Sequence, residues 1–155
     1  MLIVLAVATL GGLGSIALIV SMRAMRRAAE VSCANNLNQL WRAHNIQISQ
    51  FHSAGPMTDE TGEAFWLYLT QKLVVGPSMP ELFKCPYAGS LPGPCDYRGP
   101  RQSVNKFIAD DPVGADKPGN HGVGNGGNVL QKQGHVQHCE EGSALWKACE
   151  IKLAP

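Results

Sequence analysis

The stretch LIVLAVATLGGLGSIALIVSM, residues 2–22, decides the fold of this chain because it contains no charged residue. At a rise of about 1.5 Å per residue, a helix of this length extends roughly 31 Å, close to the ~30 Å hydrocarbon thickness of a bilayer. Arg23, Arg26 and Arg27 follow it directly. We therefore predict a transmembrane helix over residues 1–22 and one domain over residues 23–155.

The ends of this apolar stretch favour a permanent anchor over a cleavable signal. No Lys or Arg precedes Leu2, and the exit SMRAMRR lacks a small-residue cleavage site. The run also exceeds the ~7–15 residues of a signal core. We expect a single-pass membrane protein.

The orientation of the domain is left open by the residues alone. Arginines after the span predict a cytoplasmic domain by the positive-inside rule. In contrast, five cysteines in a small domain without CxxC spacing favour disulfides in an oxidising compartment.

Composition limits the function. With 13 basic and 12 acidic residues the formal net charge is +1, which gives no electrostatic case for a nucleic-acid partner. The chain has room for one small domain outside the span. Most of its 17 Gly and 10 Pro follow residue 75, which predicts a loop-rich second half.

A helical pattern continues beyond the apolar stretch over residues 23–51. Apolar side chains and one histidine recur there at three- and four-residue steps: Val31, Leu37, Leu40, Trp41, His44, Ile48 and Phe51. No Pro or Gly separates this stripe from the apolar stretch, so we predict one helix of about 50 residues that ends at His52 to Pro56.

Shorter elements follow this long helix. Thr61-Gly62-Glu63 predicts the start of a second helix that runs to Leu73. Residues 128–139 predict a β-hairpin, with Gly134 where the turn requires positive φ. Ser143 is the predicted cap of a last segment over residues 144–153. The predicted supporting core is Leu37, Leu40, Trp41, Ile48, Trp66 and Trp146.

The cysteines suggest two cross-links. A Cys85–Cys95 bridge would close a short loop, and a Cys139–Cys149 bridge would tie the hairpin to the last segment. Each bridge is worth roughly 2–3 kcal/mol. This hypothesis leaves Cys33 unpaired, and other arrangements of five cysteines remain open.

Two groups of residues are candidate metal ligands. His121, His135, His138 and Cys139 are of the type that binds zinc. They lack ligand spacing, however, and His135 and His138 would point to opposite faces of a strand, so surface histidines are the favoured interpretation. Asp110, Asp111 and Asp116 are candidate calcium ligands in a glycine-rich region. Because the spacing of a calcium loop is missing, turn-forming aspartates are favoured.

The residues give no case for an enzyme. Cys33 and His44 could be a nucleophile and its base, but they lie about 16 Å apart on a continuous helix, against the ~3 Å that proton transfer requires. No GxSxG, phosphate-binding loop or paired-carboxylate motif occurs elsewhere. We predict no catalytic residue.

Several segments resemble a known family. The most specific is CANNL (33–37), which is similar to the C-x-N-N-L of type IV pilin-like proteins of type II secretion (pseudopilins). The closest branch is the prepilin-like one with a C-terminal H-X9-DG motif that is abundant in planctomycetes. The resemblance covers residues 2–7, 28–40, 83–86, 96–100 and 121–134. Its motif residues here are Cys33, Asn35, Asn36, Leu37, His121, Asn128 and Gly134.

This resemblance implies a pilin-like α+β fold in which the long helix packs on a small loop-rich domain with a β-hairpin. It implies a structural or accessory subunit of a type II secretion pseudopilus or type IV pilus-like assembly. The chain would sit in the bacterial inner membrane with its domain in the periplasm or outside. Its partners would be the membrane and other pilin-like subunits, with no cofactor other than a candidate calcium ion.

Three features depart from the family pattern. Val4 stands where the family has the glutamate that helps to dock subunits into a filament. Gln133 replaces the motif aspartate, and its spacing from His121 is two residues longer. The missing glutamate favours an alternative, a membrane-anchored binding or sensor module that does not polymerise and that uses the loops of residues 96–127.

Overall fold

A computed structural model of the chain describes residues 2–50, 60–71, 79–87 and 93–155, with side chains described from residue 18 onward. Most side chains of the predicted membrane segment, residues 1–22, therefore lie outside the described set. Across the described residues, no helix combines the length and the apolar character that a membrane crossing needs.

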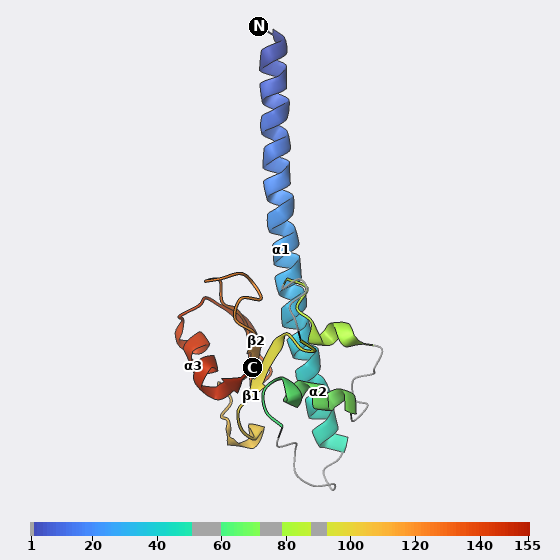
Figure 1. Cartoon of the computed structure of the whole chain (residues 1–155), viewed down its shortest axis with the longest axis vertical. Helices are drawn as coiled ribbons and strands as arrows, with labels where there is room; N and C mark the ends of the chain where they lie inside the picture. Colours follow the sequence, from blue (N-terminus) through green and yellow to red (C-terminus); the bar gives the residue numbers. More distant parts are fainter. Residues whose placement is uncertain (1, 51–59, 72–78, 88–92) are drawn as a thin grey trace.

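The first element is one long helix, α1, which spans Leu2–Gln50. Figure 1 shows that it extends far beyond the globular part of the molecule, which surrounds only its C-terminal portion. The prediction of a single continuous helix of about 50 residues is confirmed, because no proline interrupts its hydrogen bonding. The predicted end at His52 to Pro56 lies outside the described residues.

An antiparallel sheet forms the centre of the globular part. Its strands lie in the order β4-β3-β2-β1-β5. Their bounds are Tyr97–Pro100 (β1), Pro112–Asp116 (β2), Gly127–Gln131 (β3), Val136–Cys139 (β4) and Leu153–Ala154 (β5). The predicted hairpin is confirmed as β3 and β4, with Gly134 at φ 91° in the turn.

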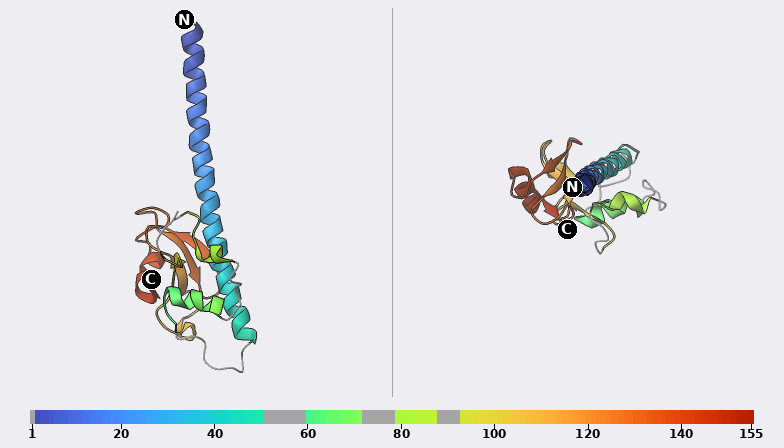
Figure 2. Two further views of the ribbon diagram at one scale, coloured as in Figure 1. Left: turned by 45° about the vertical axis from the view of Figure 1, so that its right-hand side comes forward. Right: turned by 90° about the horizontal axis from the view of Figure 1, so that it is seen from above.

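The sheet is covered on both faces. Leu130 belongs to the cluster that joins the sheet to α1 and to helix α2 (Glu63–Gln71). Its neighbour Val129 belongs to a second cluster with helix α3 (Ala144–Lys152). Successive residues of a strand point to opposite faces, so α1 and α3 lie on opposite sides, as the two views of Figure 2 also show. The result is an α+β fold.

The short elements begin where local signals place them. Helix α2 starts at Glu63 as predicted, whereas its predicted end at Leu73 lies outside the described residues. Ser143 caps α3, because its side-chain oxygen accepts a hydrogen bond from the Trp146 backbone N–H. Two 3₁₀ helices, η1 (Pro80–Phe83) and η2 (Val104–Lys106), complete the fold.

The core contains most of the predicted residues. Leu37, Leu40, Trp41, Trp66 and Trp146 are buried, and Ile48 is half-buried. The predicted position of Val31 in the stripe was wrong, since this side chain is 59% exposed. At about 100° per residue, Val31 lies roughly opposite Leu40 on the helix. The buried stripe instead begins at Cys33.

Candidate functional site

The first feature of the site is a disulfide between Cys33 on α1 and Cys85, which follows η1. The Cα atoms are 5.0 Å apart, and the two residues are separated by 52 positions in the sequence. This bridge corrects the predicted Cys85–Cys95 pairing, in which Cys33 stayed free. The cysteines that are near in sequence are therefore not the ones that pair.

Hydrogen bonds, not a disulfide, join the segments that carry Cys85 and Cys95. The carboxylate of Asp96 accepts the backbone N–H of Cys85 at 3.0 Å, so it closes this loop without a bridge. The Cys95 sulfur lies 3.6 Å from the carbonyl oxygen of Tyr97. This leaves the Cys85 side chain directed at α1.

The predicted Cys139–Cys149 bridge is also not formed. Both are free thiols buried in the second core cluster, which contains Val129 and Trp146 and is called the α3-side cluster below. Cys95 is a third free thiol. Burial raises the pKa of Cys95 and of Cys149 to about 12. These thiols are therefore protonated and poorly reactive at neutral pH.

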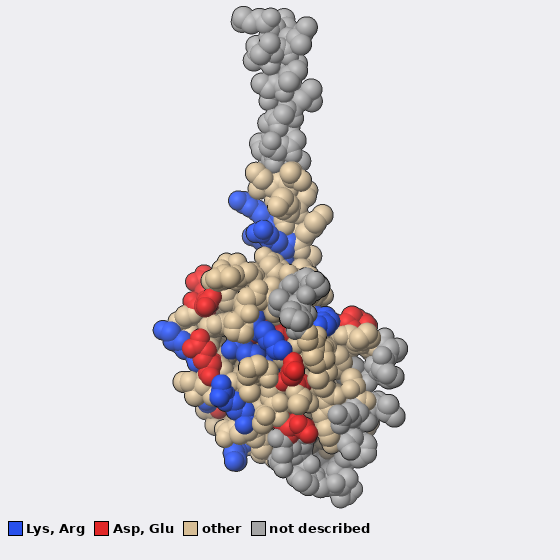
Figure 3. Space-filling model, in the orientation of Figure 1, with Lys and Arg blue, Asp and Glu red and all other residues tan. Residues whose placement is uncertain are grey.

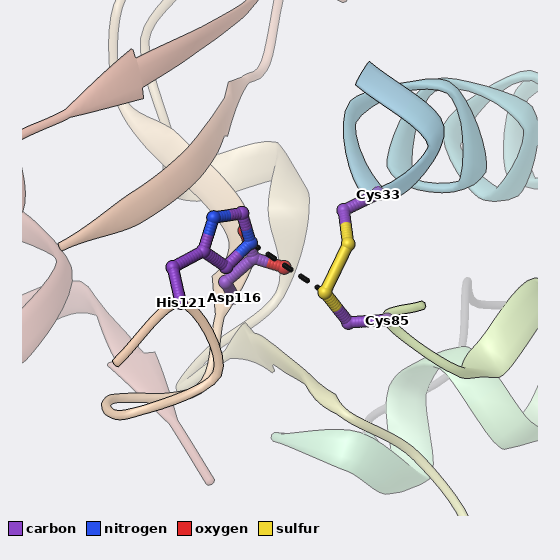
Figure 4. A group of neighbouring side chains, drawn as sticks. All are labelled: Cys33, Cys85, Asp116 and His121. Carbon is purple, nitrogen blue, oxygen red and sulfur yellow. Dashed lines mark hydrogen bonds and ion pairs between the residues drawn. A yellow bond between two sulfur atoms is a disulfide. The ribbon is translucent and has the colours of Figure 1, made fainter. Parts of the chain in front are cut away.

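A buried contact between a histidine and a carboxylate lies beside the disulfide (Figure 4). The carboxylate of Asp116, at the end of β2, is 2.8 Å from Nε2 of His121 in the following loop. The same oxygen accepts the Asn128 backbone N–H at 2.7 Å. Nε2 of His121 is also 3.5 Å from the Cys85 sulfur. One motif histidine thus contacts both the sheet and the bridge.

Other residues that carry the pilin-like resemblance join α1 to the domain. The Asn36 side chain donates hydrogen bonds to the carbonyls of Glu81 and Lys84 at 3.2 and 3.0 Å. The Asn128 side chain donates to the Glu30 carbonyl at 3.1 Å. Leu37 is buried, whereas Asn35 is exposed. Most of the motif therefore has a visible structural role.

Gly134 joins this set through the hairpin turn. Its carbonyl accepts a hydrogen bond from the Asn38 side chain on α1 at 3.1 Å. A Cβ built on Gly134 would lie 3.4 Å from the Trp41 ring, so the turn approaches the helix closely. The turn of the β3–β4 hairpin is thereby fixed against α1.

A shallow pocket of about 420 Å³ opens next to the His121–Asp116 contact. It lies between the exposed part of α1 and the β-sheet, and its lining includes Arg26, Glu30, Tyr87, His121, His138 and Glu140. The Tyr87 ring is stacked on His121, with centroids 4.7 Å apart. The pocket gives solvent access to an otherwise buried histidine.

The structure brings His121 and His138 together but not the other predicted zinc ligands. His138 faces α1, where its Nδ1 is 2.6 Å from Glu30 Oε1. His135 is exposed and precedes β4, and Cys139 is buried in the α3-side cluster. Glu30 was missed by the sequence reasoning, because only the packing of α1 against β4 places it there.

The three candidate calcium ligands do not form one site. Asp110 and Asp111 precede β2 and Asp116 ends it, so five residue steps along the strand, roughly 16 Å, separate Asp111 from Asp116. Asp111 pairs with Lys152, and Asp110 accepts a hydrogen bond from the Gln133 side chain. The three carboxylates therefore do not converge on one position in this structure.

The predicted absence of a Cys33–His44 catalytic pair agrees with the geometry. Cys33 is tied up in the disulfide, and His44 is buried between Trp41 and Phe65. Neither ring nitrogen of His44 has a hydrogen-bond partner among the described residues. Burial lowers the pKa of His44 to about 4.

This buried histidine makes stability depend on pH. Unfolded His44 titrates near 6.5 and folded His44 near 4, so the unfolded chain binds the extra proton between these values. We expect the contribution of neutral His44 to the free energy of unfolding to be intact above pH 6.5 and to be lost as the pH falls toward 4. Between pH 7.5 and 4.5 the loss amounts to roughly 2–3 kcal/mol.

Urea unfolding at both pH values tests this expectation. His44→Leu should remove roughly 2–3 kcal/mol of the pH dependence, whereas His135→Asn, a change at an exposed histidine, should leave it as in the parent. Equal pH dependence in the parent and in His44→Leu would contradict the assignment.

Comparisons with known proteins find no match: no family model, no curated protein and no solved structure corresponds to this chain. The fold itself defines the class as an α+β protein in which a long N-terminal helix packs on a five-stranded antiparallel sheet.

Proposed function

We propose that this chain is a membrane-anchored structural or accessory subunit of a pilus-like assembly, such as a type II secretion pseudopilus. The observation that carries the proposal is the division of α1. From residue 33 its buried stripe packs on the domain, whereas residues 18–28 are exposed without exception. A helix with one half in the domain and one half beyond it can anchor a subunit and bundle with others.

The exposed part of α1 has the surface that an anchor requires. Leu18, Ile19, Val20 and Met22 are each at least 49% exposed. They continue the uncharged run of residues 2–22, whose length suits a bilayer. Basic atoms gather where α1 approaches the globular part (Figure 3), and the sequence places Arg23, Arg26 and Arg27 there. Exposed apolar side chains that end at basic ones support a membrane boundary at this position.

The disulfide supports a domain outside the cytoplasm. Cys33–Cys85 closes a long loop and lies in the core that joins α1 to the sheet. Structural disulfides persist in oxidising compartments and are rare in the cytosol. We therefore assign the domain to the extracytoplasmic side, against the positive-inside rule.

Thiol labelling tests anchoring and orientation together. Val123→Cys places a thiol at a side chain that is 98% exposed, while the three native free thiols are buried. In cells with a permeabilised outer membrane, we expect a membrane-impermeant maleimide to label this variant and not the parent. The labelled chain should stay with membranes after alkaline carbonate extraction.

Two controls make the labelling decisive. Ile151→Cys, at a position that is 75% exposed on α3, should be labelled equally. A cytoplasmic marker protein with an exposed thiol should stay unlabelled. Labelling of Val123→Cys only after cell lysis would place the domain in the cytoplasm and overturn the proposal.

The second candidate function is a membrane-anchored binding module that does not assemble. The pocket of about 420 Å³ beside His121 favours it, since assembly alone needs no pocket with buried polar groups. Disulfide cross-linking between single cysteines in the exposed part of α1 separates the two functions. A binding module would remain monomeric in the membrane.

A further inference from the structure

Three side chains from distant parts of the chain meet in the pocket. Glu30 comes from α1, His121 from the loop after β2 and His138 from β4. One nitrogen or oxygen ligand atom from each lies within 4.8 Å of the others. The ring centroids of the two histidines are 5.9 Å apart. Such convergence of two imidazoles and a carboxylate is the donor set of many zinc sites.

The buried side of His121 is already arranged as in a metal site. Its Nε2–H donates to Asp116, a carboxylate with 0% exposure that is itself fixed by the Asn128 backbone N–H. In Figure 4 the other ring nitrogen, Nδ1, faces away from Asp116 and Cys85. A proton on Nε2 leaves the lone pair on Nδ1. Histidine ligands of metals are commonly oriented by a carboxylate in this way.

We propose that Glu30, His121 and His138 bind one divalent transition-metal ion of the zinc type. Imidazole nitrogens favour zinc and its neighbours, whereas calcium and magnesium prefer a shell of oxygens. Three protein ligands leave the fourth position of a tetrahedral ion open to the pocket, where water or an external donor can bind.

The geometry requires small movements of the ligand atoms, which now lie within 4.8 Å of one another. Ligand atoms about 2.0 Å from a tetrahedral ion are about 3.3 Å apart, and Glu30 and His138 are now 2.6 Å apart. Their side chains are 30% and 37% exposed, so both can turn. His121 is held in place by Asp116 and by stacking on Tyr87.

The charges around the pocket permit a cation. Arg26 and Arg27 line it, but Glu30, Glu140 and Glu141 contribute one more charge of opposite sign. The ion would connect α1 directly to β4 and to the His121 loop, next to the exposed part of the helix. The site would thus fix the domain at the base of the anchor, and it does not depend on whether the chain assembles.

Metal titration of the full chain in detergent tests this proposal. Metal-free protein without a polyhistidine tag is titrated with Zn²⁺ against a chromogenic chelator, and Co²⁺ is used as a spectroscopic probe. We expect one ion per chain, with the visible absorption of tetrahedral Co²⁺. Glu30→Gln and His138→Asn should each weaken binding at least about 100-fold. Both side chains are partly exposed, so the variants should fold.

Two control variants change residues of the same types outside the proposed site. His135→Asn and Glu81→Gln remove an exposed histidine and a glutamate outside the pocket, and they should bind as the parent does. The absence of one-to-one Zn²⁺ binding would overturn the proposal. So would binding that survives both ligand variants, or binding that appears only after reduction of Cys33–Cys85. The last result would move the metal to Cys33, Cys85, Asp116 and His121, because only reduction frees the two thiols.

Discussion

Replacing both Cys33 and Cys85 by Ala should lower the free energy of unfolding by about 4 kcal/mol. The bridge joins residues 52 positions apart, and a closed loop of this length restricts the unfolded chain by about that amount. A domain is typically stable by only about 5–15 kcal/mol, so this is a large share. The measurement is urea unfolding followed by the fluorescence of the three tryptophans.

A matched variant separates the bridge from the loss of sulfur atoms. Cys139→Ala removes a buried cysteine that is free, so it should cost far less than the double variant. A thiol reductant should destabilise the parent and leave the double variant unchanged. Equal stability of the parent and the double variant, or peptide mapping that finds Cys85 bridged to Cys95, would contradict the pairing.

Trp66→Ala should cost about 3–5 kcal/mol, as for large-to-small changes at buried aromatic residues. Trp66 is completely buried, and its ring edge contacts Phe65 in α2. A Cβ on Gly114 would lie 2.6 Å from the Trp66 ring, so the β2 backbone is already close to the indole. The indole N–H also donates to the Arg98 carbonyl at 3.0 Å. The loss therefore combines a cavity with an unpaired buried acceptor.

Trp66→Phe divides these two contributions. It keeps much of the ring volume and removes the hydrogen-bond donor, so we expect a loss of about 1–3 kcal/mol, below that of Trp66→Ala. Both variants are compared with the parent by urea unfolding at constant pH. A loss below about 1 kcal/mol for Trp66→Ala would mean that this core is not packed as described.

Local patterns in the sequence predict the elements well and the site poorly. The long helix and the hairpin follow from signals that lie within a few residues of one another. These signals are the uncharged run, the stripe from Leu37 to His44 and the turn glycine Gly134. The Cys33–Cys85 bridge spans 52 positions, and its formation depends on how η1 packs on α1. Short sequence separation was a misleading guide to pairing because Asp96 already closes the loop after Cys85.

The proposed metal ligands are likewise hard to predict from local sequence patterns. Residue type indicates His121 and His138, but strand alternation separates only His135 from His138 and does not bear on the pair that meets. Glu30 carries no signal in its own segment, and it becomes a ligand only because the hairpin lies across α1. To predict contacts between distant segments, one must know the register of the sheet and the rotation of the helix about its axis.

We propose that α1 anchors the chain in a membrane and bundles there with like helices. Disulfide cross-linking in isolated membranes, with single cysteines at Leu18, Ile19, Val20 and Met22, tests this assembly. At about 100° per residue these positions sample different faces of the helix, and all are exposed in the single chain.

We predict that oxidation cross-links some of these four positions into dimers and leaves others monomeric, as expected for one helix face at an interface. Val123→Cys, which is more exposed than any of them, serves as the control for random collision and should cross-link far less. Cross-linking of all four positions at or below the level of Val123→Cys would contradict assembly through α1.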